Sequence, residues 1–177
     1  SEKRGSPVKS FIRWSKSTIY INSPITNPDV LGIFYEAILR KTGSLDGISD
    51  KTIVVINTDA SPEKIKEQLD VKDIYTVDCL KIAMETKCKI NVIMFGAIIK
   101  AIGFVPLEKA EALLKSTLGK KYPKMLDINL VGLRRGYEEV KHQTFNSEAF
   151  YDQNPVLPRW GYQNAPIGGA NPHIGST

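Results

Sequence analysis

The feature that most constrains the fold of this 177-residue chain is the segment of residues 51–57, whose centre, residues 53–56, is an uninterrupted apolar run. Its β-branched isoleucine and valine side chains predict a strand. Because polar residues do not alternate with them, both faces of the strand must be covered, which is typical of a parallel sheet that lies between helices. The run therefore predicts an α/β domain.

The residues after this run carry the signals of a helix start. Ser61 is a suitable cap, Pro62 suits the first helical position, and Glu63 places a negative charge in the first turn. Other patterns predict strands over residues 8–14, 17–21 and 74–77, and helices over residues 79–86, 90–102, 106–118 and 123–141. Strands that alternate with helices predict a Rossmann-like, three-layer α/β domain with a mostly parallel sheet.

Three details of this pattern bear on the expected fold. Residues 30–35 could open a helix or form a buried strand followed by a short helical turn, and the strand is favoured because the run is short, apolar and bounded by turn signals. Asp78 is expected to cap the helix that follows it, and Gly119 to end the helix before it. Residues 90–102 are apolar nearly all round, which predicts a central buried helix, since the stretch is too short for the roughly 20 residues that span a bilayer.

The two ends of the chain differ from its middle. Rossmann-like folds normally begin with a strand, a glycine-rich turn and a helix, whereas this chain begins with a polar loop before its first predicted strand. We therefore expect that the N-terminal unit is missing and that the sequence is part of a larger protein. After His142, prolines and glycines interleave, which predicts an extended arm over residues 142–177 beside a folded domain over residues 1–141.

The amino-acid composition limits the kinds of metal site and ligand that this chain can have. The only cysteines, Cys79 and Cys88, are too few for an iron–sulfur cluster or a four-cysteine zinc site, and they are expected to be buried small hydrophobes. We expect that this chain binds no metal and contributes no catalytic residue. Few cysteines and a polar start without a secretion signal favour the cytoplasm. The net charge of +5 permits an anionic ligand or an acidic partner.

Several segments resemble one family in order and spacing. Residues 2–13 are similar to the E-x-R-G-(A/S)-P-V…F-x-R segment of the gamma subunit of 2-oxoacid:ferredoxin oxidoreductases, of which pyruvate:ferredoxin oxidoreductase is the best-known member. The strand that ends at Asn57 resembles the family's strand ending in asparagine. Asn91 and residues 94–97 resemble its N-x-x-x-L-G-A helix, and residues 127–138 its closing helix. Residues 165–172 are similar to the segment that leads into a ferredoxin-like delta portion when gamma and delta are fused.

The resemblance implies a multisubunit enzyme of anaerobic metabolism that oxidatively decarboxylates a 2-oxo acid and reduces ferredoxin. It implies thiamine diphosphate, magnesium and 4Fe–4S clusters on partner subunits, with coenzyme A as acyl acceptor in most members. The implied partners are the alpha and beta catalytic subunits and a ferredoxin-like delta subunit or domain. Two departures are the missing glycine-rich G-x-G-G-Q-G turn and the missing cluster cysteines of the delta portion.

Five residues are candidate cofactor contacts. Lys3, Arg4 and Arg13 belong to a basic patch, and arginine can grip a phosphate or carboxylate with two hydrogen bonds; the alternative is a solvated strand end. Asn57 ends the clearest strand, where α/β folds bind ligands, although a turn or cap role is favoured. Asn91 starts an apolar helix, so helix capping is favoured over ligand contact.

Two other classes of function remain open on the sequence alone. A free-standing nucleotide-binding Rossmann-like module is disfavoured by the missing glycine-rich turn. A nucleic-acid interaction module is supported only by the basic charge, without interleaved aromatic and basic residues, so nucleic acid and membrane are not expected partners. Pyruvate is the default substrate, and oxalate, 2-oxoglutarate and branched-chain 2-oxo acids are alternatives.

Overall fold

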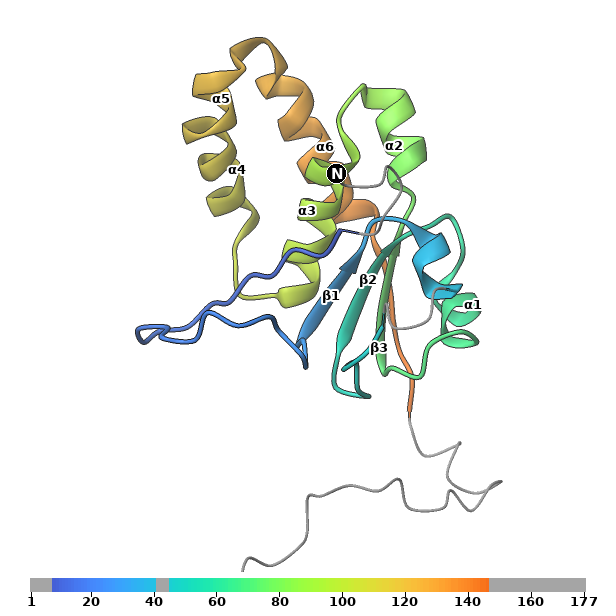
Figure 1. Cartoon of the computed structure of the whole chain (residues 1–177). Coiled ribbons are helices and arrows are strands. Elements are labelled where there is room, and N and C mark those ends of the chain that lie inside the picture. Colours follow the sequence, from blue (N-terminus) through green and yellow to red (C-terminus); the bar gives the residue numbers. More distant parts are fainter. Residues whose placement is uncertain (1–7, 41–44, 147–177) are drawn as a thin grey trace, which may run out of the picture. The chain divides into compact units, whose positions relative to one another are not determined.

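The computed structural model describes residues 8–40 and 45–146 of the chain (Figure 1). The strands are β1 (Val30–Ile33), β2 (Ile53–Asn57), β3 (Asp73–Val77) and β4 (Lys141–Thr144). The helices are α1 (Pro62–Lys66), α2 (Cys79–Thr86), α3 (Ile90–Ile102), α4 (Leu107–Ser116), α5 (Leu118–Lys121) and α6 (Leu126–Glu139), with two short 3-10 helices, η1 (Glu36–Arg40) and η2 (Pro123–Met125).

The four strands form one sheet in the order β1-β2-β3-β4. The first three run parallel, with Val54 of β2 between Leu31 and Ile74, and β4 runs antiparallel to β3. The predicted α/β fold with a mostly parallel sheet is confirmed. The ambiguous segment is also a strand, β1, followed by the 3-10 helix η1, as the favoured interpretation predicts.

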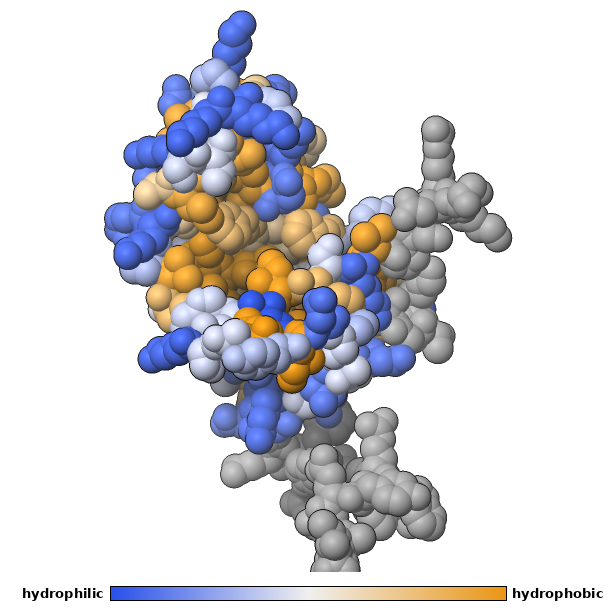
Figure 2. Space-filling model, turned by 60° about the vertical axis from the view of Figure 1, so that its left-hand side comes forward, coloured by the Kyte–Doolittle hydropathy of each residue, from blue (hydrophilic) through white to orange (hydrophobic). Residues whose placement is uncertain are grey.

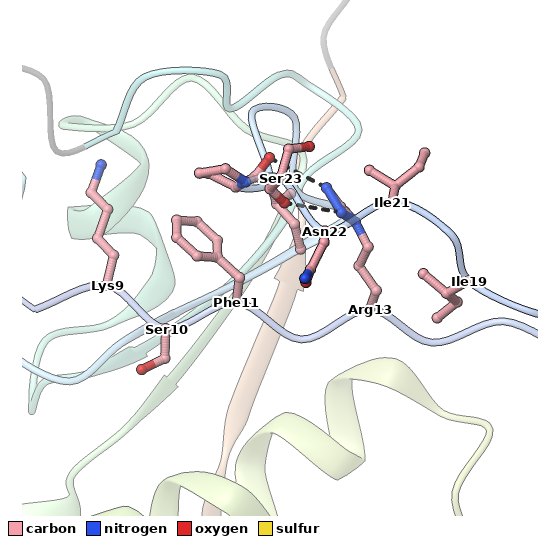
Figure 3. Close-up of a pocket in the computed structure, with 10 residues that line it drawn as sticks. Lys9, Ser10, Phe11, Arg13, Ile19, Ile21, Asn22 and Ser23 are labelled. Atoms are coloured by element: carbon pink, nitrogen blue, oxygen red, sulfur yellow. Dashed lines mark hydrogen bonds between the residues drawn. The ribbon is translucent and has the colours of Figure 1, made fainter.

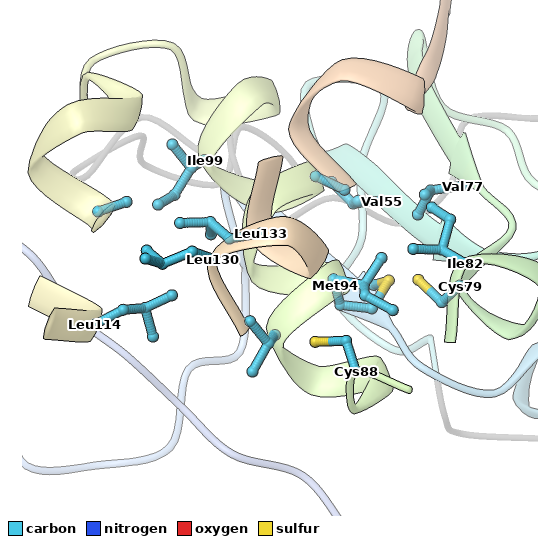
Figure 4. Close-up of a cluster of buried hydrophobic side chains, with 14 of the residues drawn as sticks. Val55, Val77, Cys79, Ile82, Cys88, Met94, Ile99, Leu114, Leu130 and Leu133 are labelled. Atoms are coloured by element: carbon cyan, nitrogen blue, oxygen red, sulfur yellow. The ribbon is translucent and has the colours of Figure 1, made fainter. Parts of the chain in front are cut away.

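The apolar run that predicts a doubly covered strand is buried on both faces. Val54 and Ile56 pack into a cluster with Ile65 of α1, and all three side chains are fully buried. Val55 points the other way, into the larger cluster with α2, α3 and α6 (Figure 4). The sheet is therefore the middle of three layers, because alternate side chains of β2 need a cover on each side.

Glycines allow α3 and α6 to pack very closely inside the larger cluster. A Cβ atom on Gly96 of α3 would lie 2.1 Å from the carbonyl oxygen of Leu133, and one on Gly136 of α6 would lie 2.0 Å from that of Ile93. Only glycine fits where one helix backbone rests on another. On its outer side α6 is held to α4 by an ion pair between Arg134 and Glu111.

The residues predicted to cap α2 and α1 differ in whether their side chains form a capping hydrogen bond. The carboxylate of Asp78 accepts a hydrogen bond from the backbone N–H of Lys81 at 2.9 Å, so the expected cap of α2 is confirmed. Ser61 precedes Pro62 at the start of α1 as predicted, but its side chain makes no capping bond. Residues 90–102 form α3 as predicted, and most of its residues are buried.

Three expectations are wrong. Residues 8–14 and 17–21 are not strands, because they form no backbone ladder with any described segment. Gly119 does not end the helical region, since α5 runs through it. His142 does not start the arm, because residues 141–144 form β4 and pair with β3, which extends the folded domain past the expected boundary.

The described part of the chain has no helix that is both long and apolar enough to cross a membrane. The chain divides into two units, 1–145 and 146–177, and every described element lies in the first. The predicted Pro/Gly-rich arm falls almost wholly on residues 147–177, outside the described residues, and stays a prediction.

Candidate functional site

Asn57 lies at the edge of the sheet where the parallel strands end. Its buried amide donates from Nδ2 to the carbonyl oxygen of Phe34 at 3.1 Å and accepts at Oδ1 from the N–H of Cys79 at 3.0 Å. The side chain therefore links the ends of β1 and β2 to the start of α2. Because both polar atoms of the amide already bond with backbone, the geometry favours the structural role of Asn57 over contact with a ligand.

A small cavity of about 150 Å³ lies beside this edge. It is lined by Thr58, Asp59, Ala60, Thr76, Asp78, Lys81, Glu139 and Lys141. Three carboxylates against two ammonium groups do not favour a phosphate group. The volume is also well below the roughly 300–1,000 Å³ of ordinary ligand pockets, so this edge is a poor site for a nucleotide within this unit.

A larger, open hollow of about 500 Å³ lies between the two legs of the N-terminal segment (Figure 3). We call residues 8–28 the N-terminal arm. Arg13 on the first leg donates from Nη1 to the carbonyl oxygen of Ser23 at 3.2 Å and from Nη2 to that of Pro24 at 3.3 Å. These two bonds tie the legs together, and Phe11, Ile19 and Ile21 line the space between them.

The predicted site residues do not converge on one place. Arg13 lies on the arm, Asn57 ends β2, and Asn91 is an exposed residue in the first turn of α3. The capping interpretation of Asn91 is wrong, because the helix begins one residue earlier and its cap is Lys89, with no capping side chain. Lys3 and Arg4 lie outside the described residues, so their role as anion contacts stays a prediction.

The two cysteines are poor nucleophiles and poor metal ligands. Burial raises the pKa of Cys79 to about 12, and burial also raises the pKa of Cys88. Both thiols therefore stay protonated near neutral pH, whereas a metal or a substrate carbonyl needs the thiolate. Within residues 8–40 and 45–146, no group of His, Cys, Asp and Glu side chains is arranged to hold a metal ion.

The feature that sequence reasoning missed is the exposed apolar surface of the arm. Ile12 is 87% exposed and Tyr20 89% exposed, while Trp14 stacks on Phe104 with ring centroids 4.8 Å apart. Figure 2 shows apolar side chains gathered on the face that carries the arm. The signal was present in the sequence as two strand-like patterns without an assignable neighbour, but the patterns alone do not say what covers them.

Comparisons with known proteins agree on one family. The family described as pyruvate ferredoxin/flavodoxin oxidoreductase matches residues 1–139. Pyruvate synthase subunit PorC of Thermotoga maritima is 36% identical over 145 residues, covering 80% of this chain and 75% of PorC. The crystal structure of the pyruvate oxidoreductase subunit PORC from T. maritima superposes with a TM-score of 0.58 at 33% identity, covering 67% of this chain and 66% of that one.

A longer relative gives a different kind of information. Pyruvate:ferredoxin oxidoreductase of Moorella thermoacetica is 28% identical over 157 residues, which is 80% of this chain but only 13% of that protein. The segment that resembles this chain is thus a small part of one much longer polypeptide there.

Proposed function

This chain belongs to the pyruvate ferredoxin/flavodoxin oxidoreductase family, and from that premise we propose that it is the gamma-type subunit, or part of it, of a 2-oxoacid:ferredoxin oxidoreductase. The enzyme oxidatively decarboxylates a 2-oxo acid and passes the electrons to ferredoxin. The observation that carries the proposal is the family match over residues 1–139, which spans nearly the whole folded unit. The alternative, a free-standing nucleotide-binding module, finds no support in the comparisons.

Pyruvate is the proposed substrate. Both the T. maritima subunit and the M. thermoacetica enzyme carry pyruvate in their names. The residues that select the 2-oxo acid are expected on the other subunits, because the cavity beside the strand ends in the described part of this chain has three carboxylates against two ammonium groups, which does not favour an anionic 2-oxo acid.

The chemistry is proposed to occur on partner subunits, which makes this chain a non-catalytic part of the enzyme. A 4Fe–4S cluster needs four cysteine ligands, and the two cysteines here are both buried and protonated. The residues present therefore do not fit a cluster. We place the clusters, thiamine diphosphate and magnesium on the alpha, beta and delta partners, and the complex in the cytoplasm.

Coenzyme A is the cofactor that this chain is best suited to approach. Its phosphates need cationic donors, and Lys3, Arg4 and Arg13 belong to the family-like opening segment. Of these, Arg13 is only partly exposed and already donates two hydrogen bonds to backbone carbonyls. Lys3 and Arg4 are therefore the better candidates for a phosphate contact, with Arg13 shaping the loop that follows them.

The test is co-production of this chain with the other subunits of its enzyme, followed by affinity purification through a tag on this chain. The expected result is a stable complex that reduces ferredoxin in the presence of pyruvate and coenzyme A. The substitution Arg4→Ala should raise the KM for coenzyme A about tenfold or more, with Lys64→Ala on α1 as the matched surface control. Failure of the subunits to associate, or full activity of the complex without this chain, would refute the proposal.

A further inference from the structure

The N-terminal arm, residues 8–28, exposes apolar side chains that a folded unit normally covers. Val8 is 84% exposed, and Ile12 and Tyr20 are nearly as exposed as free side chains. Single exposed apolar residues are common, but a contiguous apolar surface of this kind marks an interaction site. The arm is therefore a candidate docking surface.

The arm has the sequence of a strand but no strand beside it. Residues 8–14 and 17–21 carry β-branched and aromatic side chains, yet they form no ladder with any other segment among the described residues. An extended segment with open backbone groups can accept a strand from another chain, which adds main-chain hydrogen bonds to side-chain contacts.

The arm is nevertheless held in a defined shape. Arg13 joins its two legs through the carbonyl oxygens of Ser23 and Pro24, and Trp14 stacks on Phe104 beyond the end of α3. A surface that is ordered before binding loses less conformational entropy when a partner docks. The defined shape of the arm therefore favours a specific interface over an accidental exposure of apolar residues.

The charge of the arm indicates what kind of surface it meets. Lys9, Arg13 and Lys16 lie within residues 8–28, and this segment contains no acidic residue. Two copies of the arm would place like charges together, which disfavours self-association. An apolar surface with an acidic rim is complementary to it.

The relatives indicate why such a surface is needed. In the M. thermoacetica enzyme the matching segment is 13% of a single polypeptide, so in that protein it is joined covalently to the rest of the enzyme. The T. maritima relative, by contrast, is named as a subunit, and a subunit must achieve the same association through its surface. The arm is the most apolar exposed segment that the described residues offer for this purpose.

We propose that the N-terminal arm docks this chain onto another subunit of the same oxidoreductase, through an extended segment of that subunit with an apolar centre and an acidic rim. This inference rests on the proposed function and adds the surface by which it is achieved. The hollow between the two legs of the arm, lined by Phe11, Ile19 and Ile21, receives apolar side chains of the partner. Lys16 faces the acidic rim.

The experiment uses the full chain co-produced with the other subunits of its enzyme. Ile12→Asp combined with Tyr20→Asp should weaken association at least tenfold, and Lys16→Glu should weaken it less and reduce its dependence on salt. The matched controls are Leu80→Asp combined with Met84→Asp, two exposed apolar residues of α2, and Lys64→Glu on α1. Urea unfolding of each variant shows that its fold is retained.

Hydrogen exchange of the arm amides shows whether the arm is covered by another subunit, by the chain's own residues or by a second copy of the chain. The amides of residues 8–28 should exchange quickly in the free chain and become protected in the complex. Protection in the free monomer would show that the chain's own residues cover the arm, and dimers that the arm variants abolish would show self-association; either result overturns the inference. If wild type binds the other subunits and the arm variants bind equally well, the inference fails while the proposed function stands. If wild type does not bind them at all, the proposed function itself fails.

Discussion

Asn57 is the single side chain whose loss should disturb the sheet edge most. In Asn57→Ala, the carbonyl of Phe34 and the N–H of Cys79 lose their partners. The buried N–H of Cys79 left without a hydrogen bond costs about 1–3 kcal/mol, and loss of the part-buried bond to Phe34 costs about 0.5–1.5 kcal/mol. The free energy of unfolding should therefore fall by about 2–4 kcal/mol. Urea unfolding monitored by circular dichroism measures this difference.

Asn91→Ala is the matched control, because Asn91 is exposed on α3, where the exchange should change the free energy of unfolding by less than about 0.5 kcal/mol. If Asn57→Ala instead kept its stability and lost use of coenzyme A in the assembled enzyme, the ligand role of Asn57 would be correct.

The position of Asn57 could be predicted from the sequence, but its partners could not. The end of an apolar run identifies the edge of a parallel sheet. The two backbone groups that its amide bonds with lie 23 and 22 residues away, and only the packing of β1 and α2 against β2 brings them together. The sequence favours a turn or cap role for Asn57, and the structure identifies the two backbone groups that fulfil it.

At the scale of elements, the contact between α3 and α6 should tolerate no added methyl group. Gly96→Ala would place a Cβ 2.1 Å from the Leu133 carbonyl oxygen and 2.9 Å from the Tyr137 nitrogen. Backbone cannot move aside as a flexible side chain can, so the helices must separate. The free energy of unfolding should fall by about 3 kcal/mol or more, measured by urea unfolding.

Gly119→Ala in α5 is the control for this exchange, since the new Cβ would meet the side-chain tips of Leu126 at 3.1 Å and 3.4 Å and the carbonyl oxygen of Leu114 only at 3.7 Å, an ordinary contact distance. Alanine also has the better helix propensity. An equal loss of stability in both variants would mean that helix separation is not the cause.

The pairing of β4 with β3 should depend on pH through Asp73. The hydroxyl of Thr144 donates to its carboxylate at 2.6 Å and lowers the pKa of Asp73, opposed by partial burial, and His142 adds a second contact at 3.1 Å. A lowered pKa in the folded state contributes stability above the unfolded value of about 3.9, which is lost as pH falls through the folded pKa.

Asp73→Asn should therefore reduce stability at pH 7 and flatten its decline as the pH falls below about 4. Urea titrations at several pH values check this, with Glu67→Gln, which removes an exposed charge on another segment, as the control. A variant whose stability declines with acid as steeply as wild type would contradict the assignment.

The elements of the core were predictable because each carries its own pattern. The run of β2, the proline start of α1 and the uniformly apolar α3 are all local signals. The N-terminal arm and β4 were mispredicted because their structure depends on a neighbouring strand and not on their own local pattern. A strand exists only with a neighbour: residues 8–21 lack one among the described segments, and polar residues 141–144 find one in β3.

At the scale of the whole molecule, this chain alone should show no oxidoreductase activity. The purified chain is expected to contain iron and thiamine at far below one equivalent and to leave ferredoxin oxidised when pyruvate is added. The assembled complex is the positive control. Iron analysis and a ferredoxin reduction assay test this prediction. Turnover by the chain alone would show that the chain itself is catalytic.

The exposed apolar side chains of the N-terminal arm also affect the steady-state abundance of this protein in a cell. An extended segment whose apolar side chains lie open is what proteases and chaperones bind on a subunit without partners. A subunit made in excess of its partners should therefore be degraded quickly, whereas the arm of an assembled subunit is covered and protected from proteases. After synthesis is stopped, the chain should disappear several times faster when it is produced alone than with its partners, and Ile12→Asp with Tyr20→Asp should shorten its life even in their presence. The abundance of this subunit would then be set by that of its partners, without any regulation of its gene.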